Sequence, residues 1–96
     1  MEDILRKDKI IDICKSHGIN YLALFGSRAR GDAKPESDVD LLVKFNKNVS
    51  LFDLIRAENA FEGQLNLPVD LVMEDSLKPL IRPYVEKDLK VIYAEQ

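Results

Sequence analysis

The sequence predicts an α/β (α+β) fold, a small mixed sheet of three or four strands with helices on one face. Segments with the apolar period of helices alternate along the chain with segments that have the two-residue period of strands. The 96 residues fit a single domain over 1–96, near the lower end of the usual size range. A domain of this size holds one core, and helices packed on one face of a sheet bury these patterns.

The first predicted helix runs from Ile4 to His17, where apolar residues recur at spacings of three, four and seven among charged ones. Gly18 is suited to ending it, because glycine readily adopts the left-handed conformation found after many helices. Cys14 falls on the apolar side and is expected to pack in the core. A nucleophilic cysteine would need a nearby base, and His17 is one turn away, but a histidine at a helix end is more often a cap or surface residue.

Two strands with a polar loop between them are predicted next. Residues 20–25 are apolar on both faces, which predicts a central strand. A Gly-Ser pair ends this strand, and residues 28–30 permit a helical turn. Residues 31–37 are rich in Gly, Pro, Asp and Ser and predict a loop. Residues 39–45 alternate between apolar and other side chains, which predicts a half-buried strand.

The next helix has a clear start signal. Ser50 and Asp53 resemble a capping box, with Asp in place of the usual Glu. Phe52 lies off the apolar stripe of this helix and is a candidate for contact with a partner. Glu58 interrupts the stripe. The stripe itself consists of Leu51, Leu54, Ile55, Phe61 and Leu65.

The C-terminal third predicts a strand, a helix and a short final strand. Residues 69–73 alternate as a third strand, and Asp75 or Ser76 is expected to cap a helix that follows. Pro79 and Pro83 conflict with one continuous helix: one can occupy a first turn, and the other should kink or divide the segment. Val91-Ile92-Tyr93 predicts an edge strand. The apolar stripe of the last helix consists of Leu77, Leu80, Ile81, Tyr84 and Val85.

Three aspartates are predicted to share one face of the sheet. Asp38 and Asp40 are two positions apart at the head of a strand, so their side chains point the same way. In the third strand Asp70 also faces away from the apolar side, as Asp38 and Asp40 do. Two carboxylates about 4 Å apart repel by about 4 kcal/mol at an effective dielectric near 20. A bound cation relieves this repulsion, and Mg²⁺ held by carboxylates and substrate phosphates is the common one. Taken alone, however, Asp70 would be an ordinary surface residue.

A turn suited to phosphate precedes the aspartates. Gly26 allows close approach of the backbone, and Ser27 supplies a hydroxyl and an amide. Arg28 or Arg30 could add a charged contact to phosphate. A Gly-Ser pair alone is usually only a turn, but with carboxylates ten residues later it predicts a nucleoside triphosphate site. The spacing matches neither a Walker-type loop nor a calcium-binding EF-hand loop.

Composition excludes several other classes of protein. The net charge is −3, from 14 basic and 17 acidic residues, and no block of lysines or arginines forms a nucleic-acid footprint, so direct nucleic-acid binding is not expected. No apolar run approaches the ~20 residues of a membrane span, and the N-terminus lacks the apolar core of a signal peptide. The single cysteine cannot form an internal disulfide. These features indicate a reducing, cytoplasmic setting without a membrane partner.

Gly26-Ser27, ten intervening residues and Asp38-Val39-Asp40 together resemble the signature of the polymerase-β-type nucleotidyltransferase superfamily. The longer strings 25–31 and 37–42, in so short a chain, resemble the minimal nucleotidyltransferases, which commonly act as the antitoxin of a HEPN-domain toxin. The resemblance covers roughly residues 20–93 and implies the nucleotidyltransferase fold.

The resemblance also implies an activity and a role for each residue. A nucleoside monophosphate, expected to be AMP from ATP, would pass to a hydroxyl, which in antitoxin members is a tyrosine of the toxin. Gly26 and Ser27 would hold the triphosphate, and Asp38 and Asp40 would bind two Mg²⁺ ions. Asp70 would complete the metal site and help deprotonate the acceptor. In the two-metal scheme one ion activates the attacking oxygen and the other neutralises the leaving phosphates.

Two hypotheses of different class remain from the sequence. The first is a Mg²⁺-dependent protein nucleotidyltransferase that silences a toxin by modifying it. The second is a non-catalytic binding module that neutralises its partner by occlusion. Substitution of the aspartates distinguishes them, because only the enzyme needs its carboxylates.

Overall fold

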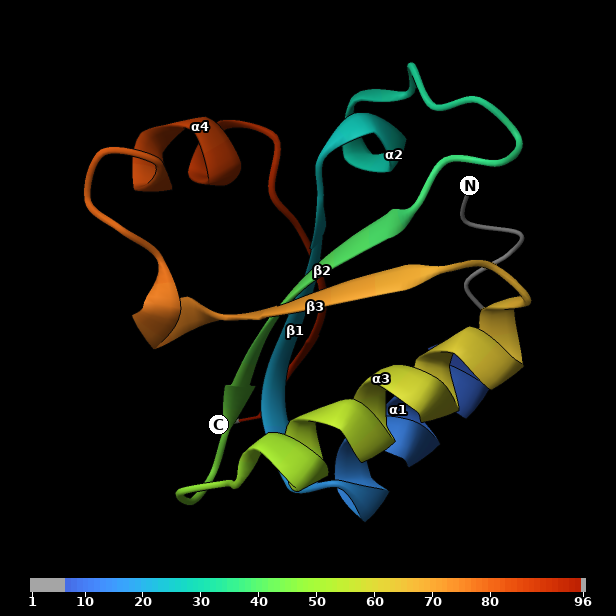
Figure 1. Cartoon of the computed structure of the whole chain (residues 1–96), viewed down its shortest axis with the longest axis vertical. Helices are drawn as coiled ribbons and strands as arrows, with labels where there is room; N and C mark the ends of the chain where they lie inside the picture. The colour runs from blue at the N-terminus through green and yellow to red at the C-terminus, as the bar shows by residue number, and fades with distance from the viewer. Residues whose placement is uncertain (1–6, 96) are drawn as a thin grey trace.

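A computed structural model describes residues 7–95 and contains a four-stranded sheet with helices packed on it (Figure 1). Helices and strands follow one another in almost the predicted order. The helices are α1 Lys7–Ser16, α2 Ser27–Arg30, α3 Leu51–Leu65 and α4 Arg82–Lys87, with a 3-10 turn, η1, at Glu74–Ser76. The strands are β1 Ile19–Phe25, β2 Val39–Phe45, β3 Val69–Met73 and β4 Lys90–Ala94. The part of the predicted first helix at Ile4 and Leu5 lies outside the described residues.

The sheet is mixed, as predicted. Its strand order is β3-β2-β1-β4. β1 pairs antiparallel with β2 on one side and with β4 on the other, whereas β2 and β3 are parallel. The central position predicted for residues 20–25 and the edge position predicted for 91–93 are both confirmed.

The two long helices, α1 and α3, cover one face of the sheet, and the main core lies between them and the strands. The other face is not fully open, in contrast to the prediction. Val85 of α4 packs there with Ala23 and Leu42, and all three are buried. The reason lies in β1, whose side chains are apolar on both faces and therefore need cover on both.

The signals predicted for the end of α1 and the start of α3 are confirmed. Gly18 follows α1 with φ 70°, in the left-handed region. Cys14 is fully buried in the core. At the start of α3, the Ser50 side chain accepts from the Asp53 amide and the Asp53 carboxylate accepts from the Ser50 amide, so the capping box is complete.

The stripe predicted for α3 is partly wrong. The buried side chains are Ala57, Phe61 and Leu65, whereas Leu51 and Ile55 are 70% and 43% exposed. The row that contains Leu51 and Ile55 continues through Glu58 and Glu62, which lie along the edge of β3 rather than over the core. Phe52 is exposed, as expected from its place off the stripe.

The two glutamates of that row satisfy the outer edge of β3. Glu58 Oε2 accepts from the Leu71 amide at 3.1 Å, and Glu62 Oε2 accepts from the Val69 amide at 2.9 Å. An unpaired strand edge otherwise invites pairing with other chains. The break in the apolar pattern at Glu58 is therefore the signature of a covered sheet edge.

The helix predicted from Asp75 or Ser76 is wrong in its start and length. That segment forms the short turn η1, and α4 begins only at Arg82, with Pro83 in its first turn. Pro79 lies in the turn that divides them, as one of the two prolines was expected to do. Because α4 has six residues, most of its predicted stripe stays in solvent: Leu80, Ile81 and Tyr84 are exposed.

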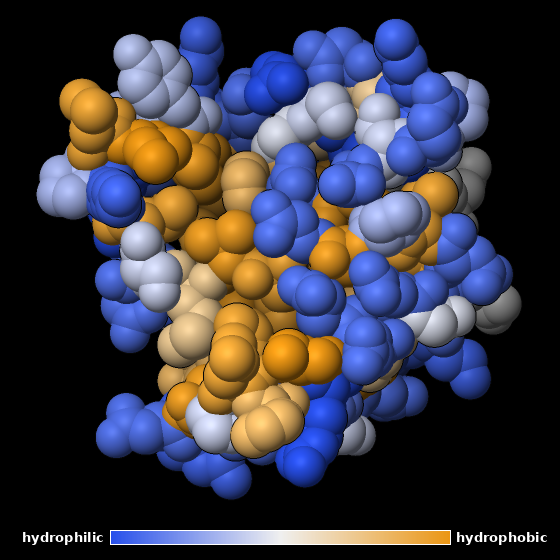
Figure 2. All heavy atoms as spheres, in the orientation of Figure 1, coloured by the Kyte–Doolittle hydropathy of each residue, from blue (hydrophilic) through white to orange (hydrophobic). Residues whose placement is uncertain are grey.

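Hydrophobic atoms gather over α4 and in the lower middle of the molecule, whereas the surface around α2 and the loop after it is hydrophilic (Figure 2). Within residues 7–95, no helix combines the length and the apolar content that crossing a bilayer requires.

Candidate active site

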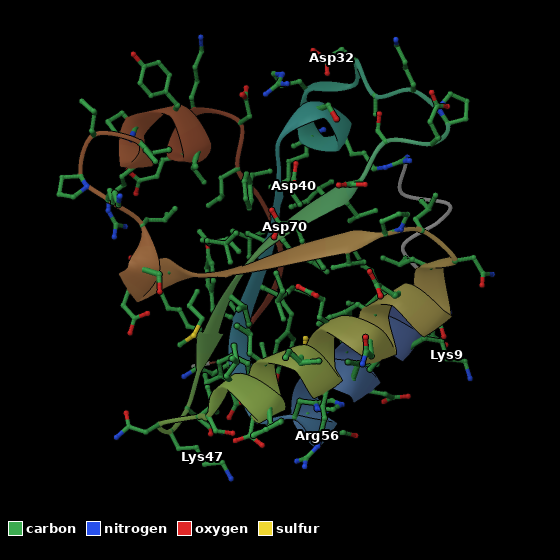
Figure 3. All side chains as sticks on the ribbon, in the orientation of Figure 1. Lys9, Asp32, Asp40, Lys47, Arg56 and Asp70 are labelled. Carbon is green, nitrogen blue, oxygen red and sulfur yellow. The ribbon has the colours of Figure 1, made fainter. Side chains whose placement is uncertain are left out.

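The three aspartates lie in the region where β1 ends and β2 and β3 begin. Asp40 and Asp70 are partners across the parallel β2–β3 ladder, so their side chains leave the same face of adjacent strands, which lie about 4.8 Å apart. Asp38 lies one residue before β2 and is exposed. Figure 3 shows Asp40 and Asp70 close together on the side of the sheet nearest α2. The structure thus brings two of the predicted carboxylates side by side and the third to their edge.

Asp40 lies at the centre of this group electrostatically. Burial raises the pKa of Asp40, the neighbouring charges of Asp70 and Asp38 raise it further, and Arg30 lowers it. Burial and neighbouring carboxylates disfavour the ionised form of Asp40, and a nearby cation would favour it. The cluster therefore has the electrostatics of a cation site.

The donor set fits a hard divalent cation in its chemistry. Carboxylate oxygens are the ligands that Mg²⁺ prefers, and the exposure of Asp38 and Asp70 leaves room for phosphate oxygens in the same coordination shell. Within the described residues, no three His, Cys, Asp or Glu side chains are already gathered in a form that could hold a metal ion. Asp38, Asp40 and Asp70 are therefore suitable ligands that are not drawn together into a closed shell.

Gly26 brings the turn into contact with Asp40. Its φ is 76°, in the region that favours glycine. A Cβ at this position would overlap Asp40 Oδ2 and lie 3.1 Å from Asp40 Cγ. Both the conformation and the space require glycine, so the Gly-Ser turn and the carboxylate form one unit. Ser27 follows directly as the first residue of α2 and is half-buried.

Arg28 is buried under the loop after α2, whereas a contact to phosphate was predicted for it. It is 8% exposed, and its guanidinium donates hydrogen bonds to main-chain carbonyl groups of the loop after α2. The expected contact to phosphate would require an outward-facing guanidinium. The polar loop that the sequence predicts folds back over α2 instead and surrounds this side chain.

Arg30 does face the site. Its side chain is about half exposed, and it pairs with Asp32 at 3.2 Å and with Asp88 at 3.6 Å. Exposed ion pairs of this kind contribute little to stability, so the guanidinium can exchange them for a phosphate at small cost. The effect of Arg30 on the pKa of Asp40 places it within electrostatic reach of the carboxylates. No sequence signal identifies Asp88, because only the fold brings the end of α4 to α2.

Other reactive or hollow parts of the molecule lie elsewhere. Burial raises the pKa of Cys14 to about 12, so this thiol is not a nucleophile at neutral pH. A cavity of about 680 Å³ lies at the opposite end of the sheet, lined by residues 44–49 and 73–75. Asp38 and Asp70 are exposed, so a large substrate can reach them, whereas Asp40 is half-buried between them.

Comparison with known proteins agrees with the geometry. Residues 8–96 match the family model described as polymerase beta, nucleotidyltransferase. The protein adenylyltransferase MntA of Thermococcus cleftensis is 40% identical over 89 residues, which are 93% of this chain and 89% of that protein. A Methanocaldococcus jannaschii protein, provisionally assigned as a protein adenylyltransferase, is 41% identical over 76 residues, 79% of this chain and 82% of that one.

Solved structures give the same fold. A protein assigned as a minimal nucleotidyltransferase superposes with a TM-score of 0.76 and 39% identity, over 88% of this chain and 87% of that one. A toxin–antitoxin structure with AMP-PNP has a TM-score of 0.80 at 23% identity, over 96% and 76% of the two chains. A Shewanella oneidensis complex of a tri-AMPylated HEPN toxin with an MNT antitoxin gives a TM-score of 0.73 at 21% identity, over 100% of this chain and 75% of that one. The predicted fold class is confirmed by these likenesses.

Proposed function

Because the chain belongs to the polymerase β nucleotidyltransferase family, we propose that it transfers AMP from ATP to a hydroxyl group of a partner protein. It is an enzyme of the nucleotidyltransferase type, like its relatives. The observation that carries the proposal is the contact of Gly26 with Asp40, beside Asp70. It joins a turn suited to phosphate with carboxylates suited to metal.

Each residue of the site then has a part in the reaction. Asp38, Asp40 and Asp70 would hold two Mg²⁺ ions, which supply charge neutralisation at the phosphates and activation of the acceptor hydroxyl. Gly26 and Ser27 would receive the triphosphate, and Arg30 would leave its exposed pairs to contact it. Asp70 would accept the proton of the acceptor hydroxyl, since it is exposed at the side where a protein can approach.

The acceptor is proposed to be a tyrosine of a HEPN-domain toxin, so that transfer silences the toxin and this chain acts as its antitoxin. Two features support a macromolecular acceptor. Asp38 and Asp70 are exposed, and proteins named as protein adenylyltransferases and a complex of a HEPN toxin with its antitoxin are among the similar proteins. Such a pair works in the cytoplasm, which agrees with the reducing setting indicated by the sequence.

The test is mass spectrometry of the partner after incubation with this chain, MgCl₂ and each of the four ribonucleoside triphosphates. We expect a gain of one or more AMP units with ATP and none with the Asp38→Asn/Asp40→Asn double variant. Asp12→Asn, on the exposed side of α1 and far from the site, is the matched control and should transfer at the wild-type rate.

A binding module that acts by occlusion is the competing function. It is favoured by the exposed apolar side chains of Leu80, Ile81 and Tyr84, which offer a contact surface that needs no chemistry. Undiminished neutralisation of the toxin by the double variant, with no mass gain in any reaction, would establish occlusion and overturn the enzymatic proposal.

A further inference from the structure

Among residues 7–95, Arg28 is the charged residue whose side chain is buried. A buried charge is costly unless it is hydrogen-bonded. Here Arg28 Nη2 donates to the carbonyl oxygens of Ser37 at 2.7 Å, Pro35 at 3.0 Å and Lys34 at 3.4 Å, and Nε donates to Ser37 at 3.1 Å. The guanidinium therefore closes the loop that runs from α2 to β2.

The loop ends at Asp38, and both neighbours of Asp38 are fixed. On one side the Ser37 carbonyl accepts two hydrogen bonds from Arg28, and the Ser37 amide donates to Lys34 at 3.0 Å. On the other side the Val39 amide donates to the Pro68 carbonyl at 2.8 Å, at the entrance to β3. The exposed Asp38 side chain is thus carried by a backbone that is held at both ends.

We propose that Arg28 is a positioning residue for nucleotidyl transfer: by clamping the Ser37 carbonyl it holds Asp38 beside Asp40 and couples it to the Gly26-Ser27 turn. This inference rests on the proposed role of Asp38 as a metal ligand. It also explains the spacing of the motif, since ten residues between Ser27 and Asp38 form a loop that returns to the helix turn from which it started.

The guanidinium is suited to this task in a way that an ammonium is not. Its planar fork directs Nε and Nη2 to the same Ser37 oxygen while Nη2 also reaches Pro35. A lysine keeps the charge but loses the fork. Since Asp38 is exposed, packing does little to hold it, and loss of the clamp leaves the metal to order the loop on binding.

The test is the affinity of the full chain for Mn²⁺, used as a probe of the metal site and followed by the EPR signal of the free ion. We expect Arg28→Lys to weaken Mn²⁺ binding by about tenfold to a hundredfold, as for other residues that orient metal ligands. The Mg²⁺ concentration for half-maximal transfer should rise equally, and kcat and the KM for ATP should approach wild type at saturating Mg²⁺. Arg56→Lys, an exposed arginine of α3 paired with Asp53, is the matched control and should change none of these (Figure 3).

A second variant guards against misfolding of Arg28→Lys. Insertion of one glycine between Ser37 and Asp38 keeps Arg28 and its carbonyl partners but separates the clamped Ser37 carbonyl from Asp38, and we expect the same loss of Mn²⁺ affinity with native circular dichroism. Unchanged Mn²⁺ affinity in both variants would overturn the inference. A raised KM for ATP that persists at saturating Mg²⁺ would also overturn it, because it would indicate a direct phosphate contact.

A double-mutant cycle separates this inference from the proposed function. In the Asp38→Asn background, Arg28→Lys should weaken Mn²⁺ binding no further, because the ligand that it positions is gone. Full transfer by Asp38→Asn would refute the role of Asp38 itself. An additive loss in the double variant, with transfer abolished by Asp38→Asn alone, would refute only the clamp.

Discussion

The two ends of the sheet carry acidic side chains in opposite electrostatic situations. At the end with Asp40, burial and the charges of Asp70 and Asp38 raise the pKa of that carboxyl above its ordinary range. At the other end, hydrogen bonds from Ser50 lower the pKa of Asp53, and the hydrogen bond from Arg82 lowers the pKa of Glu74. The acids of the second end accept hydrogen bonds from donors within the chain. At the first end, by contrast, Asp40 faces the negative charges of Asp70 and Asp38.

This difference separates residues that stabilise the fold from residues held ready for a ligand. The Glu74–Arg82 pair, at 2.7 Å, and the capping box at the start of α3 are complete within the chain. The Asp40 cluster is not: Arg30 offsets part of its negative charge, and a bound cation would offset the rest. Substitutions at the end with Asp40 should therefore mainly change activity, and substitutions at the other end should mainly change stability.

The largest effect is expected at Gly26. In Gly26→Ala the new Cβ collides with the Asp40 carboxylate, whose flexible end must turn away from the site. Displacement of a catalytic group by about 1 Å can reduce the rate by on the order of 100-fold. Transfer assays should show a loss of that order, while chemical denaturation should show a loss of about 1–3 kcal/mol from backbone strain, because φ 76° with ψ −157° is a conformation essentially restricted to glycine.

Gly31→Ala is the matched control for this prediction. Gly31 also has a positive φ, 85°, but a Cβ there meets nothing within 4 Å. With φ 85° and ψ 12° it is left-handed, unlike Gly26, so Gly31→Ala should lose about 1–2 kcal/mol of stability through its own backbone strain, with a far smaller effect on transfer. Equal losses of transfer in the two variants would show that the contact with Asp40 is not what Gly26 provides.

The opposite division is expected at the other end of the sheet. Ser50→Ala removes the side chain that accepts from the Asp53 amide, which typically costs about 1 kcal/mol of stability. Because the site is at the far end of β2, transfer at 25 °C should be unchanged. If urea denaturation shows no destabilisation, or if activity falls while the protein remains folded, the assignment of this end of the sheet to stability is wrong.

Those parts of the fold and of the site that depend on local sequence pattern could be predicted from the sequence. The Gly-Ser turn, the alternation that orients Asp40 and Asp70, and the capping box all depend on neighbouring residues. Arg28 could not be placed in this way, because its environment depends on the path of a loop that returns over it. The exposure of Leu51 and Ile55 was missed for a similar reason, since only the fold shows that their helix row follows the edge of β3.

The smallest effect concerns the repulsion at Asp40. Because the folded protein keeps this proton to a higher pH than the unfolded chain, stability is lost as the pH rises from the ordinary value of 3.8 through the raised pKa. Asp40→Asn removes that loss. In chelator at pH 7 it should therefore be more stable than wild type, by less than about 1 kcal/mol for so partly exposed a cluster. The gain should shrink as the pH falls toward 3.8.

Urea denaturation of both proteins across this pH range measures the effect, with Asp12→Asn as a control that lies outside the cluster. Mg²⁺ and nucleotide should then reverse the order. A ligand that binds the folded state stabilises it, so wild type should gain and Asp40→Asn should gain much less. Clear destabilisation by Asp40→Asn in chelator would mean that the three carboxylates do not repel one another, and that both ends of the sheet are equally well matched within the chain.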